Sequence, residues 1–136
     1  MPAIANVSIN NYAAVSHTFN PVSIDSVGVA RLVDKVGGIA VGFPGISQAL
    51  RGPTKDSRNY KLTVKVAVPT LEVTAPQSGS GFVPAPTKAY DVSAVVEIIL
   101  PERSTLAERR DLLAYLKNYL AHANVTAAVE SFETIY

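Results

Sequence analysis

The stretch RNYKLTVKVAVP, residues 58–69, alternates between apolar and polar side chains almost without interruption. One set of alternate positions is apolar: Tyr60, Leu62, Val64, Val66 and Val68. The other set is mainly polar: Asn59, Lys61, Thr63, Lys65 and Ala67. Because successive side chains of a strand point to opposite faces, this period of two predicts a strand with one buried and one solvated face.

Basic residues gather around this strand, although the whole chain has a net charge of only +1. Residues 51–65 contain five basic side chains and one acidic side chain, a local balance of +4, whereas residues 101–136 contain four basic and five acidic ones. Alternate residues of a strand lie about 6.6 Å apart, close to the repeat of a nucleic-acid backbone. Two interpretations stay open: a solvated face that protects a sheet edge, and a platform that binds phosphates.

Length and composition indicate one globular domain over residues 1–136. Hydrophobic residues make up 48% of the chain and the mean hydropathy is +0.20, which excludes a disordered protein. Charged residues make up 17%, below the roughly 25% of an average soluble domain, and this favours self-association.

Cysteine is absent, which excludes disulfides, thiolate metal sites and a cysteine nucleophile, and fits an intracellular origin. The N-terminal residues MPAIANVSIN lack the features of a signal peptide, and no run of about 18 apolar residues is present. We therefore expect a soluble protein with no membrane partner.

The segment before residue 39 predicts short strands. The runs NVSI and AVSHTF flank Asn10-Asn11-Tyr12, a suitable hairpin connection. Asn20-Pro21 is expected to break the pairing, because proline has no N–H to donate. Ser26–Val33 is a further candidate strand.

The run IAVGFPGISQALR, residues 39–51, has no single period. Pro44 and Gly45 suggest a bulge, a bend or two short strands, and Ser47–Arg51 could continue as an edge strand. Residues 69–87 contain four prolines and no lysine or arginine, and predict a long loop.

A long strand is predicted from Lys88 to Leu100, with Asp91, Ser93 and Glu97 on one parity, so β-structure extends over residues 1–100. After Pro101 the period changes to about 3.6. Two helices are predicted, at about 105–123 and 125–135, the first opened by a capping box from Thr105 to Glu108. The apolar positions expected to pack are Leu106, Leu113, Leu116, Leu120 and Phe132. Strands followed by helices indicate an α+β fold with an antiparallel sheet.

No catalytic or metal-binding constellation stands out. His17 and His122 have no second histidine, cysteine or carboxylate at ligand spacing, and polar termination of the first helix explains His122 more simply. Gly37-Gly38 and the GSG at 79–81 lack the lysine-serine/threonine ending and the context of a phosphate-binding loop. We expect a protein that is not an enzyme and needs no metal or cofactor.

Several segments occur in an order and spacing that match one known family. They are RNYKLTVKVAVPT at 58–70, a loop rich in Pro, Gly and Ser, KAY at 88–90, STLAERRDLL at 104–113 and ETIY at 133–136, with NPV at 20–22 and VARL at 29–32. In these features the chain resembles the coat proteins of single-stranded RNA bacteriophages of the levivirus type. The resemblance covers nearly the whole chain.

The resemblance implies an N-terminal hairpin and sheet followed by two helices, in an interlocked homodimer whose two sheets join and whose helices lie across the partner. It implies that dimers assemble, in the cytoplasm of the bacterial host, into an icosahedral (T=3) virion shell around single-stranded genomic RNA. It also implies that the inner sheet face binds RNA, including a translational-operator hairpin, and that a phage maturation protein is a further partner.

The resemblance also assigns residues to the RNA-facing surface. Those on the opening strand are Asn59, Lys61, Thr63 and Lys65, and those on the preceding strand are Ser47 and Arg51. For the long later strand two alignments compete. The KAY context selects Tyr90, whereas counting back from STLAERR selects Ser93, and these residues lie on opposite faces of a strand. The polar parity of Ser93 is preferred, and Tyr90 is kept as an alternative contact.

Three functions are compatible with these features. The first is a capsid protein with an RNA-facing sheet. The second is a dimeric RNA-binding regulator that does not assemble, and the third is a small enzyme or ligand-binding domain. The localised basic charge, the long loop and the helices without a catalytic task favour the first.

Overall fold

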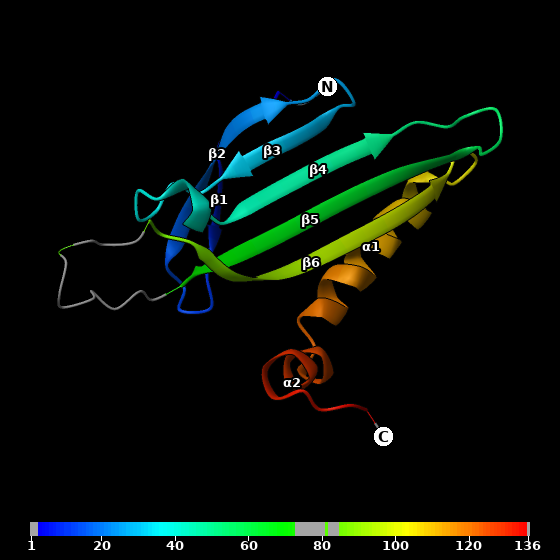
Figure 1. The fold of residues 1–136 in the computed structure, drawn as a ribbon. Coiled ribbons are helices and arrows are strands. Elements are labelled where there is room, and N and C mark those ends of the chain that lie inside the picture. Colours follow the sequence, from blue (N-terminus) through cyan, green and yellow to red (C-terminus); the bar gives the residue numbers. More distant parts are fainter. Residues whose placement is uncertain (1–2, 73–80, 82–84, 136) are drawn as a thin grey trace. The chain divides into compact units, whose positions relative to one another are not determined.

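The structure is a computed structural model of the 136-residue chain, and it describes residues 3–72, 81 and 85–135. The chain divides into two compact units, Met1–Ile99 and Leu100–Tyr136. The first unit contains the sheet and the second contains the helices (Figure 1).

The sheet has six strands, which lie side by side in the order of the sequence (Figure 1). Their bounds are β1 Val7–Asn10, β2 Ser16–Ile24, β3 Val29–Val33, β4 Gly45–Arg51, β5 Asn59–Leu71 and β6 Lys88–Pro101. The last two residues of β6 belong to the second unit. Each pair of neighbours from β1 to β5 is antiparallel. The predicted α+β fold with an antiparallel sheet is confirmed.

β5 is the strand predicted from the alternating stretch, and its residues 61–67 pair with β4. Seven residue pairs join them, from Gly45 opposite Ala67 to Arg51 opposite Lys61. The expected difference between the two faces is only partial in the single chain. Val64 and Val66 are half-buried and Lys65 is exposed, but Lys61 and Thr63 are also half-buried, and Tyr60 and Val68 are exposed. β5 therefore lies inside the sheet, between β4 and β6.

Pairing within the first hairpin ends at Phe19, as the prediction of a break at Asn20-Pro21 requires, but β2 itself continues. The strand runs through Pro21 to Ile24, but it changes partner at this point. Residues 16–19 pair with β1, and Asn20 onwards pair with β3. A register shift between Pro21 and Ser23 accommodates the proline, whose missing N–H is tolerated at such an irregularity.

The segment from residue 39 to 51 contains one short helical turn and one strand. Ala40–Gly42 forms the 3₁₀ turn η1, and β4 begins at Gly45. The expectation of an edge strand at Ser47–Arg51 was wrong, because β4 pairs with β3 on one side and β5 on the other. The candidate strand Ser26–Val33 is shorter than expected, since residues 25–28 form a turn before β3.

A small polar network anchors the first hairpin beside the few buried side chains. Phe19, Leu32 and Asp34 are the buried residues of the described chain, at 6%, 8% and 5% exposed. Asn11 Oδ1 accepts from the N–H groups of Ala13 and Val15. Its Nδ2 therefore faces His17 Nε2 (3.2 Å) and donates to it. His17 Nδ1–H then donates to Asp34 Oδ2 at 2.7 Å.

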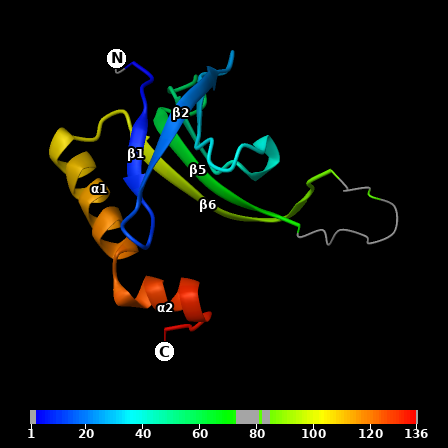
Figure 2. The same ribbon diagram turned by 90° about the vertical axis from the view of Figure 1, so that its left-hand side faces the viewer.

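The second unit contains α1, Leu106–Leu120, and α2, Ala123–Ser131 (Figure 2). The capping box is present as predicted: Glu108 N–H donates to Thr105 Oγ1, and Thr105 N–H donates to Glu108 Oε2 at 2.7 Å. The bond from the Thr105 N–H, and after it a bond that the Thr105 hydroxyl donates to Glu108 Oε2 at 2.9 Å, lower the pKa of Glu108 below its ordinary value of 4.5. They fix the start of α1.

Both helices end earlier than predicted. α1 stops at Leu120, because Ala121 is its C-cap and His122 is already the N-cap of α2, with Nδ1 accepting from Asn124 N–H. α2 stops at Ser131, because Phe132 adopts a left-handed φ of 57°. Neither described helix has the apolar length that a membrane-spanning segment needs.

Candidate nucleic-acid interface

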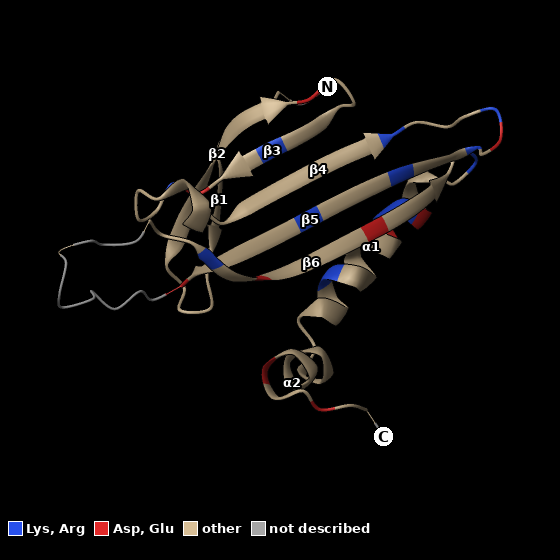
Figure 3. Cartoon of the chain, in the orientation of Figure 1, with Lys and Arg blue, Asp and Glu red and all other residues tan. Residues whose placement is uncertain are grey.

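The register of the sheet collects the basic and polar side chains on one face. Ser47 lies opposite Lys65, Arg51 lies opposite Lys61, and Arg31 of β3 lies opposite Ser47. Directly opposite residues point to the same face of an antiparallel sheet. We call this surface the basic face, and it consists of Arg31, Ser47, Arg51, Lys61, Thr63 and Lys65. Figure 3 shows its positive charges as blue bands on β3 and β5 and at the end of β4.

β6 adds acidic and polar residues to the basic face. Lys61 Nζ lies 2.8 Å from Glu97 Oε1, so the odd-numbered residues of β6 share the face of Lys61. Alternation then brings Ser93 to the basic face and places Tyr90 on the opposite face. Ser93, the preferred residue of the two alignments, thus lies on the basic face, whereas Tyr90, the alternative, does not.

Asn59 lies at the start of β5, next to the loop that joins it to β4. Together with Arg51 and Lys61 it lines a cavity of about 180 Å³. A larger cavity of about 440 Å³ follows along the face, lined by Val29, Ala49 and Thr63 and by charged side chains. Its charged lining is Arg51, Lys61 and Glu97.

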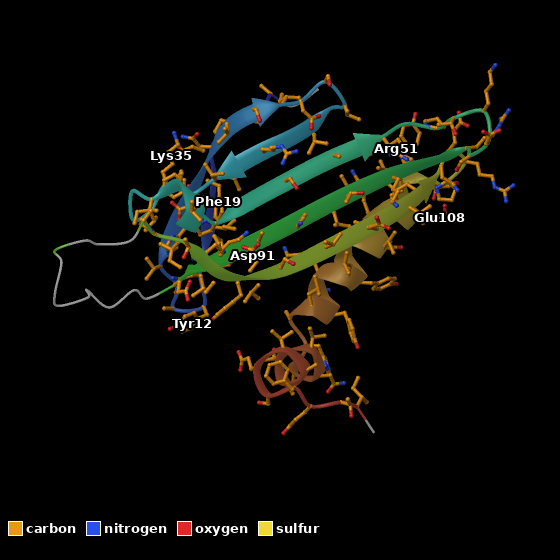
Figure 4. The ribbon with its side chains drawn as sticks, viewed as in Figure 1. Tyr12, Phe19, Lys35, Arg51, Asp91 and Glu108 are labelled. Atoms are coloured by element: carbon orange, nitrogen blue, oxygen red, sulfur yellow. The ribbon has the colours of Figure 1, made fainter. Side chains whose placement is uncertain are left out.

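A third cavity, of about 230 Å³, lies at Arg31, Ser47 and Lys65. Each of the six expected RNA-facing residues of β4 and β5 therefore lines one of these three cavities, of which the first two share Arg51 and Lys61. Arg51 is labelled at the end of β4 in Figure 4.

Arg31 and Glu97 belong to this surface but were not selected from the sequence. Arg31 is the one polar residue within the apolar run VARLV, and a charged residue among apolar neighbours could have indicated an exposed side chain. The preferred parity of Ser93 already placed Glu97 on this face, but its ion pair with Lys61 was not predicted. These two residues add one positive and one negative charge to the basic face.

Asp25, in the turn before β3, forms a long ion pair with Arg31. Its Oδ2 lies 3.6 Å from Arg31 Nη2. Its Oδ1 accepts from the N–H groups of Val29 (2.9 Å) and Val27 (3.0 Å). These bonds, first that from Val29, together with the charge of Arg31 lower the pKa of Asp25 below its ordinary value of 3.8. Asp25 is thus a fixed negative charge at the rim of the basic face.

Within residues 3–72, 81 and 85–135, no group of three or more His, Asp or Glu side chains is arranged to hold a metal ion. The two histidines have local structural contacts instead. His17 joins Asn11 to Asp34, and His122 caps α2 and stacks on Tyr119 with ring centroids 6.2 Å apart.

The apolar helix positions predicted to pack are largely uncovered in the single chain. Phe132 is 90% exposed, and more than half of each of Leu106, Leu113 and Leu120 is exposed. Leu116 is half-buried. These side chains form an apolar surface on the second unit.

The levivirus coat protein family model matches residues 2–136 of the chain. No curated protein matches its sequence. Among solved structures, the virus-like particle of bacteriophage ESE058 has a TM-score of 0.90 and 29% identity, covering 99% of this chain and 100% of that one. The virus-like particle of Beihai levi-like virus 21 has a TM-score of 0.86 and 26% identity, with 99% of each chain covered.

The bacteriophage GA protein capsid has the same fold, with a TM-score of 0.72, 16% identity, and 97% and 96% of the two chains covered. A family match over almost every residue confirms the resemblance carried by the strand, loop and helix segments. The chain belongs to the levivirus coat protein family, and its role is that of a structural, non-enzymatic component of the viral capsid.

Proposed function

We propose that the protein forms an interlocked dimer and that dimers self-assemble into an icosahedral T=3 shell around single-stranded RNA. The observation that carries assembly is the likeness of the complete chain to the ESE058 chain, which forms a virus-like particle. The likeness covers 99% of this chain and 100% of that one, so it is not limited to the sheet or to the helices.

The exposed apolar surface of the second unit supports the dimer. Isolated soluble chains rarely leave large contiguous apolar patches in water, because each Å² of exposed apolar area costs about 25 cal/mol. Leu106, Leu113, Leu120 and Phe132 are all more than half exposed. A second copy of this chain is the cover that the family resemblance implies.

RNA binding is assigned to the basic face. Its cations stand in register across β3, β4 and β5, with Arg51 opposite Lys61 and Arg31 in line with Lys65 through Ser47. One such face makes few phosphate contacts and binds weakly, but many copies in one shell hold a long RNA through avidity.

Hairpin recognition would use the neutral polar side chains between these cations. Ser47, Thr63 and Ser93 share the face and can form hydrogen bonds with base edges. In this proposal an operator hairpin of the genome contacts these residues, a phage maturation protein joins the shell, and assembly takes place in the host cytoplasm.

Electron microscopy and light scattering of the purified protein test the proposal. We expect regular closed shells that contain co-purified RNA, identified by ultraviolet absorbance and nuclease digestion after disassembly. Stable dimers that bind RNA but never assemble would support a regulator instead. Small particles without nucleic acid at low ionic strength would contradict both functions.

A further inference from the structure

The cations of the basic face differ in the partners they already have. Lys61 Nζ forms an ion pair with Glu97 Oε1 at 2.8 Å. The two side chains are 40% and 50% exposed, so the pair is open to solvent. In the part of the chain that the structure describes, neither Lys65 nor Arg51 has an ion pair.

The position of Glu97 has a physical reason in the neighbouring strand. Arg51 and Lys61 are directly opposite in the register of β4 and β5, and like charges in such positions destabilise a sheet. Glu97 contacts Lys61 from β6 and lines the same 440 Å³ cavity as both cations. Its negative charge offsets the repulsion when no other anion is present.

Two rows of charge therefore cross the sheet. The first, which we call the Arg51 row, contains Arg51, Lys61 and Glu97. The second, the Arg31 row, contains Arg31, Ser47 and Lys65. The rows are four residues apart along β5, which corresponds to about 13 Å. Each row has a carboxylate beside one of its cations: Glu97 lies 2.8 Å from Lys61, and Asp25 lies 3.6 Å from Arg31. Only in the Arg51 row is the lysine the paired cation.

This inference rests on the proposed RNA-binding role of the basic face. A phosphate that approaches Lys61 meets an ammonium group that is already paired with a carboxylate. The phosphate must displace Glu97 or share the lysine with it. An exposed ion pair is worth at most about 1 kcal/mol, so displacement is feasible but lowers the net affinity.

We propose that Glu97 competes with RNA phosphates for Lys61 and thereby sets how tightly the Arg51 row holds RNA. Without RNA, Glu97 neutralises Lys61 and stabilises the row. With RNA, the Arg31 row binds phosphates through the unopposed Lys65, and the Arg51 row binds only as Glu97 is displaced. Glu97 thus lowers the affinity of the basic face for RNA, which allows the genome to be released.

The direct test is Glu97→Gln, which keeps the size of the side chain and removes its charge. Binding of the full chain to a fluorescent single-stranded 20-nucleotide oligouridine is measured by anisotropy at several salt concentrations, with light scattering to confirm an unchanged assembly state. We expect about two- to fivefold tighter binding at ~0.1 M salt. The slope of log affinity against log salt should become steeper by about 0.7, the value for one added phosphate contact on a single strand.

A double-mutant cycle separates competition from a general loss of negative charge. In a Lys61→Gln background, Glu97→Gln should change the affinity by less than about 1.5-fold, because the lysine it competes for is absent. The matched control is Asp91→Asn, which removes a carboxylate of the same strand and parity that pairs with Lys88 instead. Its effect should be small and independent of Lys61.

The inference is overturned if Glu97→Gln leaves affinity and salt slope unchanged, or if it acts equally with and without Lys61. If Glu97→Gln does not fold, Glu97→Asp replaces it, since the shorter side chain withdraws the carboxylate from Lys61. It should also tighten binding, and unchanged affinity overturns the inference.

Lys65→Gln distinguishes this failure from failure of the proposed function. If Lys65→Gln weakens binding while the Glu97 variants have no effect, only the competition is wrong. If Lys65→Gln also has no effect, the basic face is not the RNA surface.

Discussion

The basic face of the sheet and the helices of the second unit both expose large side chains, but with opposite chemistry. The basic face presents cations that are hydrated or paired with nearby carboxylates, such as Lys61 with Glu97. The helices present apolar side chains, of which Phe132 is 90% exposed. One surface is stable in water and the other is not.

The difference indicates two kinds of association. Exposed charged groups are stable in water because they are hydrated, so the basic face can bind and release an anionic partner as the salt concentration changes. Apolar groups gain their stability only when they are covered, which requires a permanent protein partner. The proposed dimer is therefore obligate, whereas the proposed RNA contact is conditional.

The strongest test of this contrast places charge on the helical surface. Leu116→Asp together with Leu120→Asp should abolish soluble dimer, since each uncompensated buried charge costs about 3–5 kcal/mol. Size-exclusion chromatography with light scattering measures the loss. Asn118→Asp is the control on the same helix and should leave the dimer intact. Native dimers from the double variant would show that this helix face is not covered.

A smaller effect is expected from removing charge on the sheet. Lys61→Ala with Lys65→Ala should leave folded dimers but lower the RNA content of purified particles. The slope of log affinity against log salt should fall by about 1.4, for two lost contacts with a single strand. Arg103→Ala with Lys117→Ala removes the same charge from the second unit as a control. Equal losses from both pairs would contradict a localised RNA surface.

The smallest expected effect is on the stability of the start of α1, and it depends on neither a second subunit nor RNA. Folding lowers the pKa of Glu108 from its ordinary value of 4.5. The ionised carboxylate therefore stabilises the folded state above pH 4.5, and this stabilisation is lost as the pH falls through the lowered pKa of the folded state. Thermal unfolding followed by circular dichroism from pH 6 to pH 3 measures this loss. Glu108→Gln should unfold at a lower temperature at pH 6, with the difference narrowing towards pH 3. A difference that does not change with pH would exclude the capping carboxylate as its source.

Sequence patterns predicted those elements whose formation depends on interactions between residues close together in the chain. The alternation of residues 58–69 identified β5, and the Thr105–Glu108 spacing identified the capping box at the start of α1. In both cases the pattern and its structural cause lie within one element. The family segments added the order of the elements, which the sheet and the family match confirm.

Other features depended on contacts between distant segments. Proline at position 21 was expected to break the pairing, but a change of partner strand lets β2 continue. β4 has glycine and proline at its start and no clear period, so its central position follows only from pairing on both sides. The alternation in β6 showed that Tyr90 and Ser93 lie on opposite faces, but the face that joins Lys61 is identified by Glu97.

The change of partner within β2 divides the sheet into segments of unequal resistance to opening. Within β2, residues 16–19 pair with β1 and the residues from Asn20 onwards pair with β3, which also pairs with β4. In the described chain, the side-chain hydrogen bonds between these segments are those from His17 to Asp34 and from Asn20 Nδ2 to the backbone oxygen of Thr18. Thermal fluctuations can therefore detach the first hairpin as a separate unit, with its amide hydrogens exchanging before those of β4 and β5.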